Sequence, residues 1–101
     1  MRVDKEGYLL DLGDWSPRVA AELAAHAGVT LTPEHWAVLD TLRDFYQETR
    51  VSPSMRPLVK LIAERLGADK GSSIYLLSLF PGNPAKLAAK IAGLPRPTHC
   101  L

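Results

Sequence analysis

The chain has 101 residues, which is enough for one hydrophobic core but not for two, so a single domain is expected. Hydrophobic residues make up 47% of the chain and charged residues 23%, which is ordinary for a globular protein in water. With 12 basic and 11 acidic residues, the net charge of +1 gives no general attraction to nucleic acid. No apolar run approaches ~18 residues and no signal peptide is evident, so we expect a cytoplasmic protein without membrane contact.

Residues 7–10 are the first candidate element, a short stretch that permits β conformation but is too brief to be stable without a partner strand. Three helix starts then share one pattern, a capping side chain followed by proline at the first helical position. The pattern occurs at residues 16–17, 32–33 and 83–84. It predicts helices over about 17–27, 33–48 and 84–92, with Gly28 and Gly93 placed to end the first and the last.

Two further helices are expected between the second and the last of these. Ser54 can cap a helix over about 55–66, which Gly67 ends, and Asp69 can cap another that runs to Phe80. The residues expected to form buried stripes are Val38, Leu39, Leu42, Phe45 and Tyr46 in the helix over 33–48, and Leu58, Ile62 and Leu66 in the helix over 55–66. The fold class is therefore mostly α, a compact bundle of about five helices with a short N-terminal β segment.

The last eight residues differ from the rest of the chain. Pro95 and Pro97 fix φ and remove backbone donors, so this stretch cannot continue a helix or enter a sheet. We therefore expect a body over residues 1–93 and an extended, exposed C-terminal arm over residues 94–101. At ~3.1 Å per residue, such an arm could hold Cys100 roughly 20 Å from Gly93, a reach suited to delivering a thiol into another protein.

Cys100 is the only cysteine, which excludes an internal disulfide and a cysteine-based zinc site. Arg96 and protonated His99 favour its thiolate, whereas the nearby terminal carboxylate disfavours it, so activation in the free protein should be modest. His26 and His35 have no ligand spacing to each other or to the arm, and neither a metal nor another cofactor is expected.

Two pairs of basic residues are candidate partner-binding sites. Lys86 and Lys90 share a helix face next to the arm and, with Arg96, could attract a thiolate, a persulfide or an acidic partner, although many such pairs are only solvated surface. Arg56 and Lys60 form the second pair. Because Glu64 follows one turn later, an internal ion-pair ladder is favoured over a partner-binding patch there.

The sequence closely resembles the TusE/DsrC family of sulfur-carrier proteins. The resemblance rests on LFPGNPAK at residues 79–86, KIAGLPRP at 90–97 and the penultimate Cys100, with GYL at 7–9, Trp15, LTPEHW at 31–36, RDFY at 43–46 and RPLVK at 56–60 fitting upstream. It implies a sulfurtransferase that carries sulfur as a persulfide on Cys100.

The resemblance also separates two branches of this family. Members that work with dissimilatory sulfite reductase have a second cysteine eleven positions before the penultimate one, where this chain has Ala89. The resemblance therefore favours the TusE branch, in which a TusBCD-type complex donates sulfur and an MnmA-type thiouridylase uses it for 2-thiouridine at the tRNA wobble position. The alternative within the family is a DsrC-like carrier in dissimilatory sulfur metabolism.

A nucleic-acid-binding module is the alternative from a different class. The helices expected on either side of residues 67–71 could form a helix-turn-helix. Near-neutral net charge and few basic residues on the second helix argue against it, so sequence-specific DNA binding is not expected. Trp15 and Trp36 lie close to helix starts and are interpreted as core or capping aromatics rather than as a platform for stacked bases.

Overall fold

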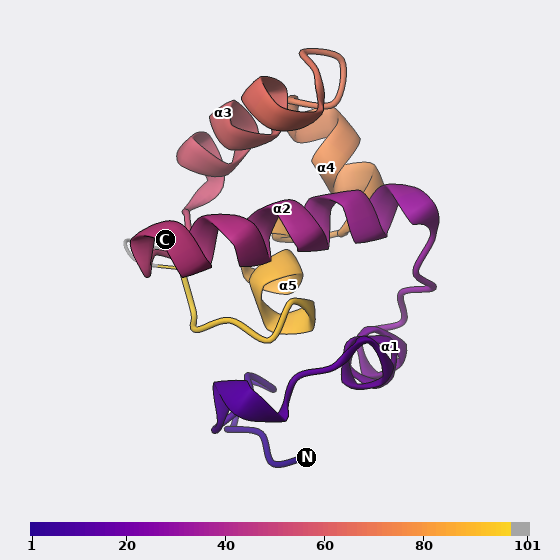
Figure 1. The fold of residues 1–101 in the computed structure, drawn as a ribbon. Helices are drawn as coiled ribbons and strands as arrows, with labels where there is room; N and C mark the ends of the chain where they lie inside the picture. The colour runs from indigo at the N-terminus through magenta and orange to yellow at the C-terminus, as the bar shows by residue number, and fades with distance from the viewer. Residues whose placement is uncertain (98–101) are drawn as a thin grey trace.

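The computed structural model describes residues 1–97, so the predicted site residues His99 and Cys100 lie outside the described part of the chain. Figure 1 shows α2 crossing the middle of the molecule, with α3 and α4 on one side and α5 on the other. The predicted helical bundle is confirmed. Its elements are the 3-10 helix η1 (Leu12–Asp14) and the helices α1 (Pro17–His26), α2 (Pro33–Thr49), α3 (Met55–Leu66), α4 (Ser73–Leu79) and α5 (Pro84–Ile91).

The capping pattern correctly identified three helix starts. The side chains of Ser16, Thr32 and Asn83 accept hydrogen bonds from backbone N–H groups in the first turns of α1, α2 and α5, and proline follows each cap. At the start of α3, Ser54 occupies the cap position, but its side chain makes no capping hydrogen bond. The helix begins there because Ser54 has extended backbone and its carbonyl accepts from the Leu58 N–H.

The start of α4 differs from the prediction, because Ser72 rather than Asp69 is its cap. Residues 67–71 instead form a turn that passes close to α3, where a Cβ on Gly71 would lie 2.3 Å from the Cβ of Ala63. α4 therefore begins only after this close approach to α3. On the shortened helix Leu76 is buried, whereas Ile74 is 83% exposed and Leu77 is 42% exposed.

α5 is the central element of the bundle and contacts α1, α2, α3 and α4. Most of its buried side chains are small, which allows the other helices to approach its backbone. They are Pro84, Ala85, Ala88, Ala89 and Ile91. The expected stripe on α2 is buried at Val38, Leu39 and Leu42 and half-buried at Phe45 and Tyr46, while α3 buries Leu58 and Ile62 and half-buries Leu66.

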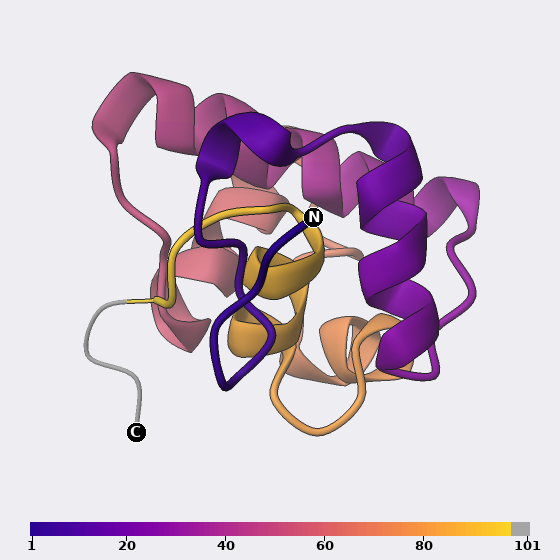
Figure 2. The ribbon, with the colours of Figure 1, turned by 90° about the horizontal axis from the view of Figure 1, so that it is seen from below.

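The first residues of the chain form a small hairpin, called here the N-terminal hairpin (residues 2–10). A single antiparallel bridge joins Val3 and Leu9, and the Leu10 N–H donates to the Arg2 carbonyl at 3.0 Å. The partner that residues 7–10 need is thus the segment just before them. Figure 2 shows this hairpin lying across α5. Within residues 1–97, no helix is long and apolar enough to cross a membrane.

α5 is followed by Gly93, a position at which any larger residue would clash with its surroundings. Gly93 has φ +72°, and a Cβ there would lie 2.2 Å from Cδ1 of Trp15. Gly28 occupies the equivalent position after α1, with φ +75°, and a Cβ there would meet no other atom within 4 Å. The two glycines therefore share a backbone requirement, but only Gly93 also permits a close contact.

We expect Gly93→Ala to destabilise the protein more than Gly28→Ala. Both variants place a side chain in the left-handed region, at about 1–2 kcal/mol, but Gly93→Ala must also displace Trp15, at about a further 1–3 kcal/mol. Urea unfolding followed by circular dichroism measures the difference. Equal losses of unfolding free energy in the two variants would contradict the packing of Trp15 on Gly93.

Candidate functional site

The structure brings together three of the predicted basic residues around one buried tyrosine. The ring of Tyr8 is 4% exposed, and its hydroxyl donates to the carbonyl oxygen of Lys86 at 3.4 Å. Lys90 Nζ lies 5.4 Å from the centre of this ring, and Cζ of Arg96 lies 5.6 Å from it. Both cations are within the range of cation–π attraction, so Tyr8 links the N-terminal hairpin to α5 and to the arm.

Acidic residues of the N-terminal hairpin hold Arg96 in this position. Its guanidinium forms an ion pair with Glu6 at 2.6 Å, with both side chains about half exposed. Slight desolvation opposes ionisation of the exposed Asp4, but N–H groups of Tyr8 and Glu6 and the positive charge of Arg96 together lower the pKa of its carboxyl. An exposed pair of this kind typically stabilises a fold by about 0–1 kcal/mol, so the contact orients Arg96 more than it stabilises the protein.

The described part of the arm is packed on the body. Residues 94–97 form neither helix nor strand, as their prolines predict, but Leu94 is 3% exposed and belongs to the hydrophobic core. Pro97 is buried as well, and only Arg96 in this segment is classed as exposed. Figures 1 and 2 both show the segment running from α5 to the linker between α2 and α3. The arm therefore starts along a path fixed by the body.

The path begins at the C-terminal end of α5, where four backbone carbonyls have no partner within the helix. The Leu94 N–H donates to the Ala89 carbonyl at 2.9 Å, and the Gly93 N–H donates to the Lys90 carbonyl at 3.1 Å. These two bonds form a Schellman motif, which reverses the chain direction after the helix. They leave the carbonyls of Ile91 and Ala92 to be satisfied from elsewhere.

Two side chains from distant parts of the sequence satisfy them. Trp15 Nε1 donates to the Ile91 carbonyl at 3.0 Å, and Arg43 Nη1 donates to the Ala92 carbonyl at 2.7 Å. The guanidinium of Arg43 also lies over the Trp15 ring, with Cζ 3.7 Å from the ring centre. Burial lowers the pKa of Arg43, and the nearby Asp40 and Asp44 partly oppose this effect. We call these two side chains, with their two carbonyl bonds, the α5 clamp.

Sequence reasoning did not find the α5 clamp. Arg43 entered only through a motif of the family resemblance, and Trp15 was interpreted as a core or capping aromatic. A signal was present in the position of Arg43, which directly follows the buried Leu42 at the edge of the apolar stripe on α2. A cation at such an edge is partly buried, and it therefore needs an acceptor.

Arg56 and Lys60 lie elsewhere, on the exposed surface of α3. The predicted ion-pair ladder is wrong, because among residues 1–97 no salt bridge involves Arg56, Lys60 or Glu64. The cation of α3 that does form a pair is Arg65, whose Nη1 lies 3.0 Å from Glu48 of α2. Arg56 and Lys60 therefore remain available to solvent.

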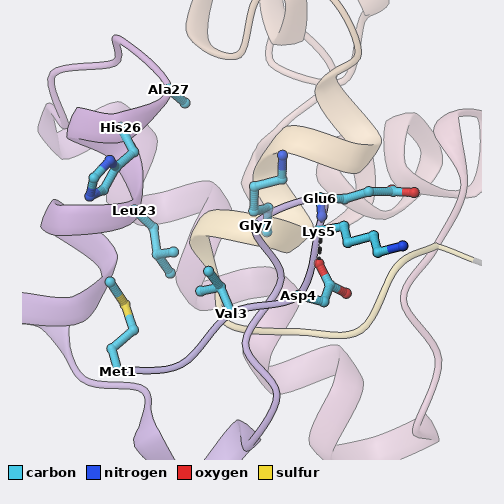
Figure 3. A pocket seen from close by; sticks show the side chains of 10 residues that line it. Met1, Val3, Asp4, Lys5, Glu6, Gly7, Leu23, His26 and Ala27 are labelled. Atoms are coloured by element: carbon cyan, nitrogen blue, oxygen red, sulfur yellow. Dashed lines mark hydrogen bonds between the residues drawn. The ribbon is translucent and has the colours of Figure 1, made fainter.

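A cavity of about 380 Å³ lies between the N-terminal hairpin and α1 (Figure 3). Figure 3 shows Val3 and Leu23 pointing toward one another, with His26 further along α1. Asp4, Glu6 and Lys90 also line the cavity, so it borders the ionic contacts that hold Arg96. Its lining mixes apolar, acidic and basic groups and defines no single ligand chemistry.

The described residues thus form a small helical body that directs a C-terminal segment along a fixed path. A family model described as "DsrC like protein" matches residues 1–101. The chain is 52% identical to the sulfurtransferase TusE homolog of Haemophilus influenzae and 48% identical to the sulfurtransferase TusE of Escherichia coli K12, over 100% of this chain and 93% of each relative.

Comparison with solved structures also finds similarity to DsrC proteins. The DsrC of Allochromatium vinosum, determined by NMR, superposes with a TM-score of 0.90 at 48% identity and covers 98% of this chain and 88% of that one. The oxidized γ-subunit of dissimilatory sulfite reductase (DsrC) from Archaeoglobus fulgidus gives 0.85 at 39% identity, over 99% and 91% of the two chains. The chain belongs to the DsrC-like family, and it is a sulfurtransferase of the sulfur-carrier type.

We expect Leu94→Ala to lower the free energy of unfolding by about 2–4 kcal/mol, because the side chain is buried in the core. The same substitution at Leu77, which is 42% exposed, should cost much less. Chemical unfolding of the two variants measures the comparison. If Leu94→Ala were as mild as Leu77→Ala, the first residue of the arm would not be part of the core in solution.

Proposed function

We propose that this protein is a cytoplasmic carrier in a sulfur relay to tRNA. In this proposal Cys100 accepts sulfur from a TusBCD-type complex and passes it to an MnmA-type thiouridylase, which forms 2-thiouridine at the wobble position. The full-length similarity to two TusE sulfurtransferases supports it. A reducing cytoplasm suits it, because it keeps the single thiol free of disulfides between transfers.

The choice of the TusE branch over the DsrC branch with two cysteines rests on Ala89. This residue is 1% exposed on α5, and its carbonyl accepts from Leu94 at the start of the arm. With alanine at 89 and one cysteine in the chain, the protein can hold sulfur as a persulfide but cannot close a sulfur bridge within itself. Such a carrier must give its sulfur to another molecule.

The chemistry requires no oxidant and no cofactor. The Cys100 thiolate attacks the outer sulfur of a donor persulfide, a new S–S bond forms, the donor's S–S bond breaks, and the donor leaves as a thiolate. In the second step an acceptor thiolate attacks the outer sulfur on Cys100, and the Cys100 thiolate leaves. Each step exchanges one S–S bond for a similar one, so the protein contributes chiefly docking and orientation.

Lys86, Lys90 and Arg96 are the proposed docking surface for the partners. Lys86 and Lys90 belong to α5, the helix that precedes the arm, and Arg96 belongs to the arm itself. A positive surface beside the arm would steer an acidic partner toward the thiol. His99, adjacent to Cys100, is proposed to contribute a further positive charge when it is protonated.

Similarity to Allochromatium vinosum DsrC at a TM-score of 0.90 supports a second candidate, a DsrC-like carrier in dissimilatory sulfur metabolism. The two candidates share the persulfide chemistry and differ in the acceptor. Measuring 2-thiouridine in tRNA therefore distinguishes them, because only the first candidate requires the protein for that modification.

We expect Cys100→Ser to abolish sulfur uptake and to lower tRNA 2-thiouridine to the level of a strain without the protein, because a hydroxyl cannot form a persulfide. The assay is complementation of an E. coli strain lacking its own TusE, with nucleoside mass spectrometry as the readout. Intact-mass analysis should show that the wild type gains one sulfur that a reductant removes and that the variant gains none. Normal thiolation with Cys100→Ser would contradict the proposed function.

We expect Lys86→Glu to slow sulfur exchange with protein partners by about two- to tenfold at low salt, and the effect should fade as salt rises. Lys60→Glu makes the same charge reversal on the exposed surface of α3 and serves as the matched variant. Exchange rates measured at several salt concentrations test the pair. If Lys60→Glu were the damaging change and Lys86→Glu were neutral, the docking surface would be on α3 at Arg56 and Lys60 instead.

A further inference from the structure

We infer that Trp15 and Arg43 are positioning residues for sulfur transfer, an inference that rests on the proposed function of Cys100. They act through the C-terminal end of α5 and determine the direction in which the arm leaves the body. The observation behind this is the α5 clamp, in which each side chain donates to one of the last two carbonyls before Gly93.

The α5 clamp ties this helix end to distant parts of the chain. The Schellman bonds from Gly93 and Leu94 already reverse the chain, but Ile91 and Ala92 are fully buried, so their carbonyls need partners within the protein. Trp15 and Arg43 are respectively 76 and 49 positions away in sequence from the carbonyls that they bind. Three separate segments of the chain are thus joined at the residue from which the arm departs.

The contacts leave little freedom to the position of this junction. The Trp15 ring fills the space that a Cβ on Gly93 would occupy, with Cδ1 only 2.2 Å from that point. Arg43 covers the ring at 3.7 Å while its Nη1 binds Ala92, so the guanidinium is held by two contacts at once. A planar guanidinium can stack and donate in this way, whereas a lysine ammonium cannot do both.

The rest of the described arm depends on where this junction lies. Leu94, the next residue, enters the core, and Arg96 then reaches Glu6 and Tyr8. A shift at the end of α5 would displace both contacts. A small persulfide can approach a thiol from any side, but a protein partner that docks on the body must meet the arm where the body directs it. The α5 clamp should therefore matter only for protein partners.

The test compares two kinds of sulfur donor with the full chain. Trp15→Phe keeps an aromatic ring and removes the Nε1 donor, and Arg43→Lys keeps the charge and removes the stacked plane. The donors are cysteine persulfide and a TusBCD-type complex loaded with sulfane sulfur. For both variants we expect uptake from cysteine persulfide to stay within about twofold of wild type, and exchange with the complex to fall by about tenfold or more.

Two control variants separate positioning from general destabilisation. Arg65→Lys alters another arginine near an aromatic ring, with Cζ 5.8 Å from the centre of Phe45, and Ile62→Val removes one buried methylene from the core. Both should leave the two rates unchanged. The inference is overturned if exchange with the complex is unaffected in Trp15→Phe and Arg43→Lys, or if Ile62→Val lowers it equally at the same loss of melting temperature.

A wild-type protein that takes up sulfur from cysteine persulfide but not from the complex would overturn the proposed donor rather than the α5 clamp. Hydrogen exchange then decides the inference, because the amides of Gly93 and Leu94 donate within the Schellman motif. We expect both amides to exchange faster in Trp15→Phe and Arg43→Lys and at the wild-type rate in Arg65→Lys. Unchanged exchange in all three variants would show that the junction does not depend on Trp15 and Arg43.

Discussion

The hydrogen bonds that satisfy the C-terminal carbonyls of α5 are the constraint on which the other parts of this structure depend. α5 packs against four other helices, so the position of its last turn is tied to the whole core. Its four final carbonyls are bound by Leu94, Gly93, Trp15 and Arg43. A buried helix end without such partners would cost several unsatisfied polar groups. The same hydrogen bonds therefore fix both the end of α5 within the core and the direction in which the arm leaves the body.

The helices could be predicted from the sequence because the signals that start and end them are local. A capping side chain followed by proline, as at Asn83 and Pro84, needs no knowledge of the rest of the fold. The start of α4 was missed because a tertiary contact decided it. Gly71 passes against Ala63 of α3, and this approach favours a turn where Asp69 offered an equally good local cap.

The site could be predicted only in part, because contacts between distant parts of the chain also decide where its residues lie. Placing Lys86, Lys90 and Arg96 near one another followed from their closeness along the chain. What gathers them is Tyr8, at the other end of the sequence, and its hydrogen bond to Lys86 spans 78 positions. The ion-pair ladder on α3 failed for a different reason. Spacing of i and i+4 permits such contacts, but exposed pairs gain too little energy to be reliable.

The electrostatic balance around Arg96 also bears on how such a carrier can work. Glu6 neutralises the guanidinium, and Asp4 ionises readily beside it because its pKa is lowered. The described start of the arm is therefore held by charges that a partner's own acidic groups could replace at little cost, since the pair is half exposed. The contacts of Leu94 and the α5 clamp have no such substitute in a partner. Sulfur exchange between persulfides changes little in bond energy, so a carrier needs no elaborate catalytic site. It needs an arm whose start is fixed to the body and whose exposed contacts can be exchanged for contacts with a partner. Residues 93–97 combine these two properties, through the buried Leu94 and the half-exposed ion pair of Arg96.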